Sequence, residues 1–313
     1  MPDKPFKTHD EQILILESRG IDFSNPKSKG FAKSRLQHIG YYALINGYNK
    51  LFLSSKIPED QYKPGTTIEE IHSLYCFDKE LRSALLEHIL SFETNIKTLI
   101  AYYFSESYGH ENYMLMNNFD TNKQGAYTKI TKVISDYHNQ IASRSSDPSI
   151  LHYLKTYGYI PLWVANNVLT FGQISKFYAI MKQQDRQKIS KIFHLQDSEL
   201  ENILYYLSSV RNFCAHGDRM YCYRSKKPLI NLKIHSQLSI PKLASGEYQY
   251  GKRDLFAAMI ALKYVISNRA YKKLIKNIKD SCNKYAPKFS VISIDDVLSE
   301  MGFPQDWDTS LTT

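Results

Sequence analysis

The sequence lacks the features that would crosslink the chain or anchor it in a membrane. Four cysteines in 313 residues are too few for a disulfide scaffold, and no two of them form a C-x-x-C pair. No apolar run approaches the roughly 18–20 residues that a membrane-spanning helix needs, and the polar N-terminus has no apolar signal core. We therefore expect a protein of the reducing cytoplasm that has no membrane partner.

Short motifs of common nucleotide, hydrolase and metal sites are absent as well. The chain has no G-x-x-x-x-G-K-[ST] phosphate loop, no G-x-G-x-x-G fingerprint and no G-x-S-x-G elbow. No two of its ten histidines are three or four residues apart, the spacings at which one helix presents two metal ligands. We therefore expect neither a bound metal nor a cofactor.

Positive charge is in excess, and one segment concentrates it. Lys and Arg number 40 against 31 Asp and Glu, which gives a net charge of +9. This charge permits a polyanionic partner, but the general richness in Lys, Ile, Asn, Tyr and Phe is an equally simple explanation of the total. The distribution along the chain is more informative than the total. Residues 251–288 contain ten Lys and Arg but only two acidic residues, Asp254 and Asp280.

Regular spacing of apolar residues predicts a long central helix. Residues 66–108 contain neither Gly nor Pro, and apolar side chains recur there at intervals of three, four or seven. The members of this stripe are Leu81, Leu85, Phe92, Ile96, Leu99 and Tyr103. Thr66 or Thr67 would cap the helix and Gly109 would end it. About 40 residues would reach roughly 60 Å, so we expect a break or a bend.

Shorter helices are expected on both sides of the long one. Thr8 caps the first, which Gly20 ends. Further helices are expected from about 29 to 40, over 126–142, over 161–178 with an interruption at Phe171-Gly172, over 198–216 and over 254–278. Residues 229–240 alternate apolar and polar side chains, which predicts a strand or a hairpin. The predicted fold is mainly α, a helical bundle with a short β-hairpin insertion. We expect a single domain over 1–313, in which a basic helix and tail (251–313) pack on 1–250.

One short stretch carries residues suited to phosphate chemistry. Arg211, Asn212 and His216 lie at the end of an apolar-periodic helix. Asn212 and His216 are four apart and share a face, and Arg211 is offset from His216 by about 140°. An arginine grips phosphate oxygens at two points, an amide orients a neighbour, and an imidazole titrates near neutral pH.

These groups are what metal-free RNA cleavage needs. His216 can take the proton of a ribose 2′-OH or protonate the leaving 5′ oxygen, and Arg211 can stabilise the charge on the phosphorus centre. A two-fold dimer would bring two copies of the motif together. Ordinary helix-end roles remain open, because a terminal His interacts with the helix dipole and an Arg pairs with a nearby carboxylate.

Two charged residues of the long helix are possible supports for this motif. Arg82 and Glu93 fall on one stripe with Leu86 and Ile89. A partly buried ion pair that fixes helix packing is favoured over a catalytic carboxylate. The tyrosines are expected mostly in the core, with a minority stacking on bases.

Several pieces of the chain, in order, resemble the abortive-infection D/F-type (Abi-like) bacterial family. They are Lys4-Pro5-Phe6, Asp10-Glu11-Gln12, Ile39-Gly40-Tyr41-Tyr42, Gly47-Tyr48, Leu74-Tyr75, Phe77-Asp78-Lys79-Glu80-Leu81-Arg82, Phe92-Glu93, Ala101-Tyr102-Tyr103, Pro161 with Trp163, Phe171-Gly172, Ile174-Ser175-Lys176-Phe177-Tyr178, Arg211-Asn212, Cys214-Ala215-His216, Met301-Gly302-Phe303-Pro304 and Trp307. The sequence departs from the family pattern after His216, where Gly217-Asp218 replaces a second His or a Ser, and at Asn167, near which an acidic residue is expected.

The resemblance implies a HEPN-type bundle, because the Abi-like family is assigned to the HEPN superfamily, whose hallmark is Arg, a polar residue and His. Arg211, Asn212 and His216 match that hallmark. HEPN ribonucleases are typically metal-independent homodimers, so the implied function is an endoribonuclease toxin of anti-phage defence. A small non-coding RNA is the implied antitoxin.

The expected site follows from these matches. His216 is the general acid or base, Arg211 holds the phosphate, and Asn212 orients one of them. The residues expected to hold the RNA backbone are Arg219, Arg224, Lys263, Lys272, Lys273, Lys276 and Lys279. The main alternative is a non-catalytic HEPN module that binds RNA or protein, and a second is nucleotidyl or other small-molecule chemistry on the same scaffold.

Overall fold

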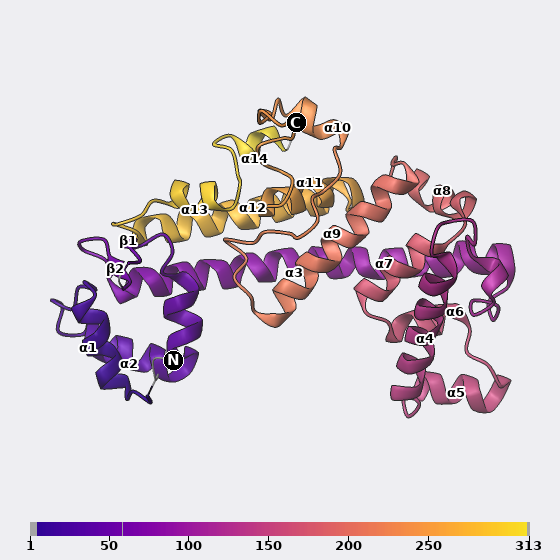
Figure 1. Ribbon diagram of the computed structural model, residues 1–313, viewed down its shortest axis with the longest axis horizontal. Helices are drawn as coiled ribbons and strands as arrows, with labels where there is room; N and C mark the ends of the chain where they lie inside the picture. Colours follow the sequence, from indigo (N-terminus) through magenta and orange to yellow (C-terminus); the bar gives the residue numbers. More distant parts are fainter. Residues whose placement is uncertain (1–4, 58, 312–313) are drawn as a thin grey trace. The chain divides into compact units, whose positions relative to one another are not determined.

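A computed structural model describes residues 5–57 and 59–311 and is mainly α-helical (Figure 1). The chain divides into two compact units. Unit 1 holds the described residues of Met1–Leu85, His216–Arg224 and Lys272–Thr313, and unit 2 holds Leu86–Ala215 and Ser225–Tyr271. The mainly α class is confirmed, whereas the expectation of one domain stays a prediction.

Unit 1 begins with two short helices, each of which ends near a glycine with a positive φ. Thr8 caps α1 (His9–Ser18) in a capping box with Glu11, and Gly20 follows with a left-handed φ of 95°. The cap at Thr8 and the end of the helix at Gly20 were predicted, but the part played by Glu11 was not. The other elements of unit 1 are α2 (Ser28–Ile39), the π-helical turn η1 (Tyr42–Asn46), β1 (Leu53–Ser55), β2 (Gln61–Tyr62), η4 (Ala286–Lys288), α13 (Ile294–Glu300) and α14 (Trp307–Ser310).

Unit 2 is built from shorter helices around an aromatic core. Phe177 lies at its centre, with ring centroids 5.2 Å from Phe104, 5.4 Å from Phe119 and 5.3 Å from Tyr137. Helix α4 packs on α7, and α5 packs on α6 (Figure 1). The elements of unit 2 are η2 (Met116–Asn118), α4 (Ala126–Ser143), α5 (Pro148–Tyr157), α6 (Leu162–Ala165), η3 (Asn166–Val168), α7 (Phe171–Ile180), α8 (Gln183–Ile192), α10 (Lys233–Gln237) and α11 (Leu255–Val265).

Three helices continue from one unit into the other: α3 (Ile68–Tyr108), α9 (Asp197–His216) and α12 (Asn268–Tyr285). A break or a bend was expected in the long helix, and the break is wrong, because all 41 residues of α3 are helical. The predicted stripe is buried as far as Ile96, but beyond it Ile100 and Phe104 are buried in place of Leu99 and Tyr103. Each step of four residues advances about 40° past a full turn, so the buried face rotates around α3 from Ile96 to Phe104.

The strand predicted over 229–240 is also wrong. In the part of the chain that the structure describes, the paired strands are β1 and β2, whereas residues 229–232 run without regular structure into α10 and 238–240 follow it. Side chains take the hydrogen bonds that a partner strand would provide, since Asn202 accepts from the Ile230 N–H at 2.7 Å and donates to the Pro228 carbonyl at 3.2 Å. The Lys252 ammonium donates to the Leu229 carbonyl.

Two other helix boundaries differ from expectation. The helix predicted over 254–278 is two helices, α11 and α12, because the chain is extended at Ile266 and the Ser267 hydroxyl accepts the Ala270 N–H at 3.3 Å. In the helix predicted over 161–178, the interruption expected at Phe171-Gly172 lies just before these two residues, at Thr170. Thr170 forms a capping box with Gln173 and starts α7.

Candidate functional site

The residues predicted for RNA chemistry lie together in the last two turns of α9. The buried side of this helix includes Leu207, Val210 and Cys214, which leaves Arg211 half-buried and Asn212 exposed. His216 is the exposed last residue of the helix. Its position follows from Gly217, which adopts a left-handed φ of 74° and ends the helix.

A buried carboxylate of α3 holds Arg211 in place. The Nε of Arg211 donates to Oε2 of Glu93 at 3.2 Å, and the Lys97 ammonium lies 2.9 Å from Oε1 of the same carboxylate. Lys97 also donates to the Leu169 carbonyl at 2.8 Å. The Glu93 side chain is 8 % exposed, whereas that of Arg211 is 29 % exposed. Because Glu93 binds Nε, it does not occupy the Nη1–Nη2 edge of the guanidinium. This second edge is the one suited to bind phosphate.

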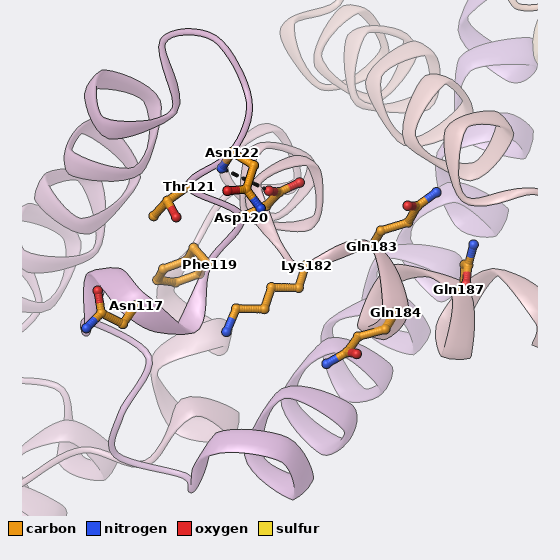
Figure 2. Close-up of a pocket in the computed structure, with 9 residues that line it drawn as sticks. All are labelled: Asn117, Phe119, Asp120, Thr121, Asn122, Lys182, Gln183, Gln184 and Gln187. Carbon is orange, nitrogen blue, oxygen red and sulfur yellow. Dashed lines mark hydrogen bonds between the residues drawn. The ribbon is translucent and has the colours of Figure 1, made fainter.

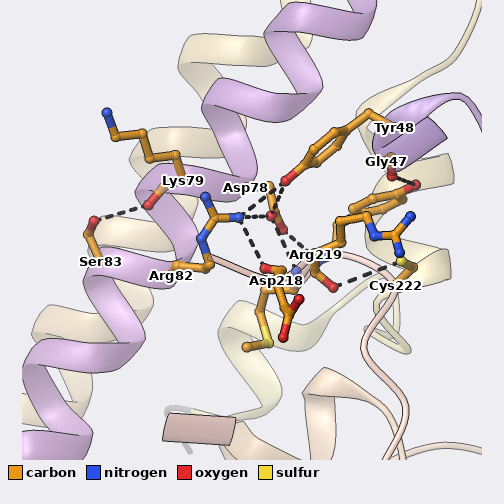
Figure 3. Close-up of polar contacts among 11 residues, drawn as sticks. Gly47, Tyr48, Asp78, Lys79, Arg82, Ser83, Asp218, Arg219 and Cys222 are labelled. Carbon is orange, nitrogen blue, oxygen red and sulfur yellow. Dashed lines mark hydrogen bonds and ion pairs between the residues drawn. The ribbon is translucent and has the colours of Figure 1, made fainter. Parts of the chain in front are cut away.

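A second buried carboxylate fixes the segment that follows His216 (Figure 3). Asp78 is fully buried and accepts hydrogen bonds from the backbone N–H groups of Met220 at 3.2 Å and Tyr221 at 2.6 Å. The Tyr48 hydroxyl donates to it at 2.8 Å, and Arg82 forms an ion pair with it. Burial raises the pKa of the Asp78 carboxyl, and Arg82 and these donors oppose that shift.

Arg82 and Arg219 hold the same segment through backbone carbonyls (Figure 3). Arg82 donates to the Asp218 carbonyl at 3.2 Å, and Arg219 donates to the Asn46 carbonyl at 3.1 Å. Arg82 and Glu93 are thus both in ion pairs, as the packing interpretation expects, but with different partners. Sequence reasoning missed Asp78, although its spacing of four from Arg82 on α3 was the available signal.

The basic residues predicted to hold RNA fall into different environments. Arg224 is tied to the Glu300 carbonyl at 3.0 Å and lies 3.4 Å from its carboxylate, and Lys279 pairs with Asp308 at 2.7 Å. Lys263 is half-buried on α11, where burial lowers the pKa of its ammonium. The exposed lysines of α12, apart from Lys279, include Lys272, Lys273 and Lys276. The structure therefore separates Lys263 from the basic helix to which it was assigned.

One surface depression in unit 2 does not involve any predicted residue (Figure 2). It has a volume of about 850 Å³ and lies between the chain around Phe119 and the start of α8. Amide side chains dominate its lining, including Asn117, Gln183 and Gln187. The Lys182 ammonium at its edge lies 5.0 Å from the centre of the Tyr108 ring. The lining also includes one acidic and one basic side chain, Asp120 and Lys182, beside the amides that offer hydrogen bonds.

Metal-ligand clusters and membrane-spanning helices are two features that the described residues lack. Within residues 5–57 and 59–311, no group of three or more His, Cys, Asp or Glu is placed to hold a metal ion. In that same part of the chain, no helix combines the length and the apolar character needed to cross a bilayer.

Comparisons with known proteins point to one family. Neither the curated proteins nor the solved structures include a match to this chain. A family model described as Abi-like protein matches residues 34–222, which is more than half of the chain and includes α3, the motif of α9 and the segment that Asp78 holds. The family name suggests a function in abortive infection. The chain belongs to the family of Abi-like proteins.

Proposed function

We propose that this protein is a metal-independent HEPN endoribonuclease that acts as a toxin in abortive infection. One observation carries the proposal: Glu93 holds Arg211 through Nε, while the guanidinium stays partly exposed on the helix that ends with the exposed His216. A positioned arginine and a solvent-accessible histidine on one helix are the groups that phosphate-ester chemistry requires. Neither is buried in the interior, where no substrate would reach it.

The proposed reaction uses the 2′-OH of the substrate as the nucleophile. O2′ attacks the adjacent phosphorus and the P–O5′ bond breaks, so the products are a 2′,3′-cyclic phosphate and a free 5′-OH. His216 removes the proton from O2′ or delivers one to O5′, Arg211 stabilises the charge on the non-bridging oxygens, and Asn212 orients one of these groups. DNA lacks the 2′-OH and is not cut.

A homodimer would supply the second acid–base group. His216 of one protomer would remove the proton while the same residue of the second protomer protonates the leaving oxygen. Rates that fall with dilution of the protein would support this arrangement. A small structured RNA that binds the basic surfaces without being cut is the proposed antitoxin.

The decisive experiment compares His216→Ala with His138→Ala, which removes an exposed histidine of α4. Labelled single-stranded RNA is incubated with each variant in EDTA, and the product ends are identified by mass spectrometry. We expect the parental protein and His138→Ala to yield cyclic phosphates and His216→Ala to be inactive. Equal cutting by His216→Ala would overturn the proposed chemistry, and tight RNA binding without any cutting would support a non-catalytic RNA-binding module. Loss of activity in EDTA would overturn metal independence.

A further inference from the structure

A second depression in unit 2 lies beside the Glu93–Lys97–Arg211 cluster and has a volume of about 450 Å³. One wall is the face of α3 that carries Thr94, Thr98 and Tyr102, and the other is the segment from Trp163 to Asn167. Tyr102 is 61 % exposed and Trp163 is 48 % exposed. Large aromatic rings left open at a concave surface are favourable places for a flat ligand to stack.

The polar groups of this depression suit the edge of a nucleobase. The hydroxyls of Thr94 and Thr98 donate to helix carbonyls at 3.1 Å each, so their oxygens remain hydrogen-bond acceptors. Asn167 is exposed at the rim and its amide offers both donors and an acceptor. Asn166 is instead part of the frame, since it accepts from Tyr137 at 2.8 Å and donates to the Lys97 carbonyl at 3.0 Å.

Lys97 connects this depression to the proposed phosphate site. It is a lining residue, and its ammonium shares the Glu93 carboxylate with Arg211. The residues that line the depression include no Asp or Glu, so no carboxylate in the lining would repel a phosphate carried in with the base. A base and the phosphate attached to it could therefore contact neighbouring parts of one surface.

We propose that this depression binds one unstacked base of single-stranded RNA, next to the phosphate that Arg211 holds. The inference rests on the proposed function, because it takes RNA to be the substrate. Trp163 stacks on the base, Tyr102 closes the opposite side, and Asn167 reads the base edge. A base within a duplex is already stacked and paired, so the subsite selects single strands.

Further aromatic rings beyond Trp163 suggest where the strand continues. The His110 ring centre lies 5.4 Å from that of Trp163, and the Tyr159 ring centre lies 5.3 Å from that of His110. A hydrogen bond of 2.8 Å joins His110 to the Tyr159 hydroxyl, which fixes the two rings. The next base of the strand stacks along this row.

Intrinsic fluorescence can report on this subsite directly. The chain has two tryptophans, and Trp307 is buried, so Trp307→Phe leaves Trp163 as the single tryptophan, whose emission is followed by exciting at a wavelength that tyrosine does not absorb. This variant is titrated with short 2′-O-methyl RNA, which cannot be cut, and with the same strand carrying abasic positions. We expect quenching by the first strand and little by the second. Equal quenching by both, or none by either, would overturn the subsite.

Binding measurements with matched variants complete the test. Trp163→Ala and Tyr102→Ala are expected to weaken binding of the 2′-O-methyl strand on the order of 10-fold each, and Trp163→Phe to retain most of it. The control is Tyr127→Ala, an aromatic residue of α4 that is 63 % exposed. Equal weakening by the control would contradict the proposal, as would unchanged binding by Trp163→Ala. If the 2′-O-methyl strand quenches Trp163 but ordinary RNA is not cut, the proposed nuclease activity is wrong and the base subsite is supported. If ordinary RNA is cut but the 2′-O-methyl strand causes no quenching, only the proposed subsite is wrong.

Discussion

Glu93 binds Arg211 across 118 residues of sequence, with 3.2 Å between Oε2 and Nε. The acid is on α3 and the arginine is near the end of α9. Helix α9 therefore holds the backbone of Arg211, and α3 supplies the carboxylate that binds its guanidinium. Lys97 pairs with the same carboxylate, which leaves this buried acid with two cationic partners. The cluster as a whole carries one net positive charge and is suited to bind an anion.

Glu93→Gln is expected to lower the cleavage rate more than it changes the affinity for RNA. The amide still accepts a hydrogen bond from Nε, but the charge-assisted bond is lost. Such a loss is worth about 1–2 kcal/mol, or on the order of 10-fold in rate. The measurement is kcat and KM on one RNA, with urea unfolding to check the fold. The matched control is Glu106→Gln, an exposed acid of α3 paired with Lys188, and an equal loss of kcat there would contradict the prediction.

Asp78→Ala is expected to destabilise the protein strongly. The substitution leaves Arg82 without its buried partner and two backbone N–H groups without their acceptor. The expected fall in the free energy of unfolding is about 3–5 kcal/mol, measured by urea denaturation. Asp280→Ala removes an exposed acid of α12 and should change stability by less than about 0.5 kcal/mol. Similar urea midpoints for both variants would show that the Asp78 network is not needed for folding.

Tyr48→Phe tests the same network more gently. It removes the hydroxyl that donates to Asp78 at 2.8 Å and accepts from Arg82 at 3.2 Å, but keeps the ring that stacks on Tyr221. We expect a loss of about 1–2 kcal/mol in the free energy of unfolding. A loss as large as that of Asp78→Ala would place the main contribution in the hydroxyl and not in the carboxylate.

Local signals predicted most of the helices because they act over a few residues. The cap at Thr8 and the glycine after His216 each mark a helix boundary through nearby residues. The apolar spacing of α4 likewise marks its buried face. The approximate bounds of α3 were predicted, but its continuity was not predictable in this way. Its continuity follows from burial of successive apolar residues, such as Phe92 and Ile96, along the whole helix.

The site was predictable only where its residues are close in sequence. Arg211 and His216 share one helix, so their spacing was visible. Glu93 was singled out as a charged residue on an apolar stripe, but its partner Arg211 is far away in the chain. The spacing of four between Asp78 and Arg82 was visible, but the other partners of Asp78 are backbone N–H groups of Met220 and Tyr221, which leave no pattern in a sequence.

Stability should fall at alkaline pH in part because of Tyr108. Burial, together with the hydrogen bond of 2.5 Å to Asp185, raises the pKa of Tyr108 to about 12. The native state then keeps a proton that the unfolded chain releases above about pH 10. The free energy of unfolding therefore decreases as pH rises from about 10 to about 12, and Tyr108→Phe should reduce this slope.

Urea midpoints measured across that pH range check this prediction. Ser107→Ala is the control, because it removes the neighbouring hydrogen bond to Asp185 without removing a group that titrates in this range. It should lower stability by a similar amount at each pH. A Tyr108→Phe curve parallel to that of the parental protein would contradict the assignment.

The lysines of α12 should differ in what they contribute to RNA binding. Lys272 and Lys276 are exposed, whereas Lys279 pairs with Asp308 at 2.7 Å. If α12 docks RNA, each lysine that contacts a phosphate of a single strand adds about 0.7 to the slope of log K against log salt. The double variant Lys272→Ala/Lys276→Ala should therefore reduce the slope by about 1.4. Lys279→Ala should change it less, because Asp308 already pairs with that ammonium and Lys279 therefore releases fewer counterions from the RNA. The slope is obtained from anisotropy titrations of a 2′-O-methyl RNA at several salt concentrations, and an unchanged slope in the double variant would exclude α12 as the docking surface.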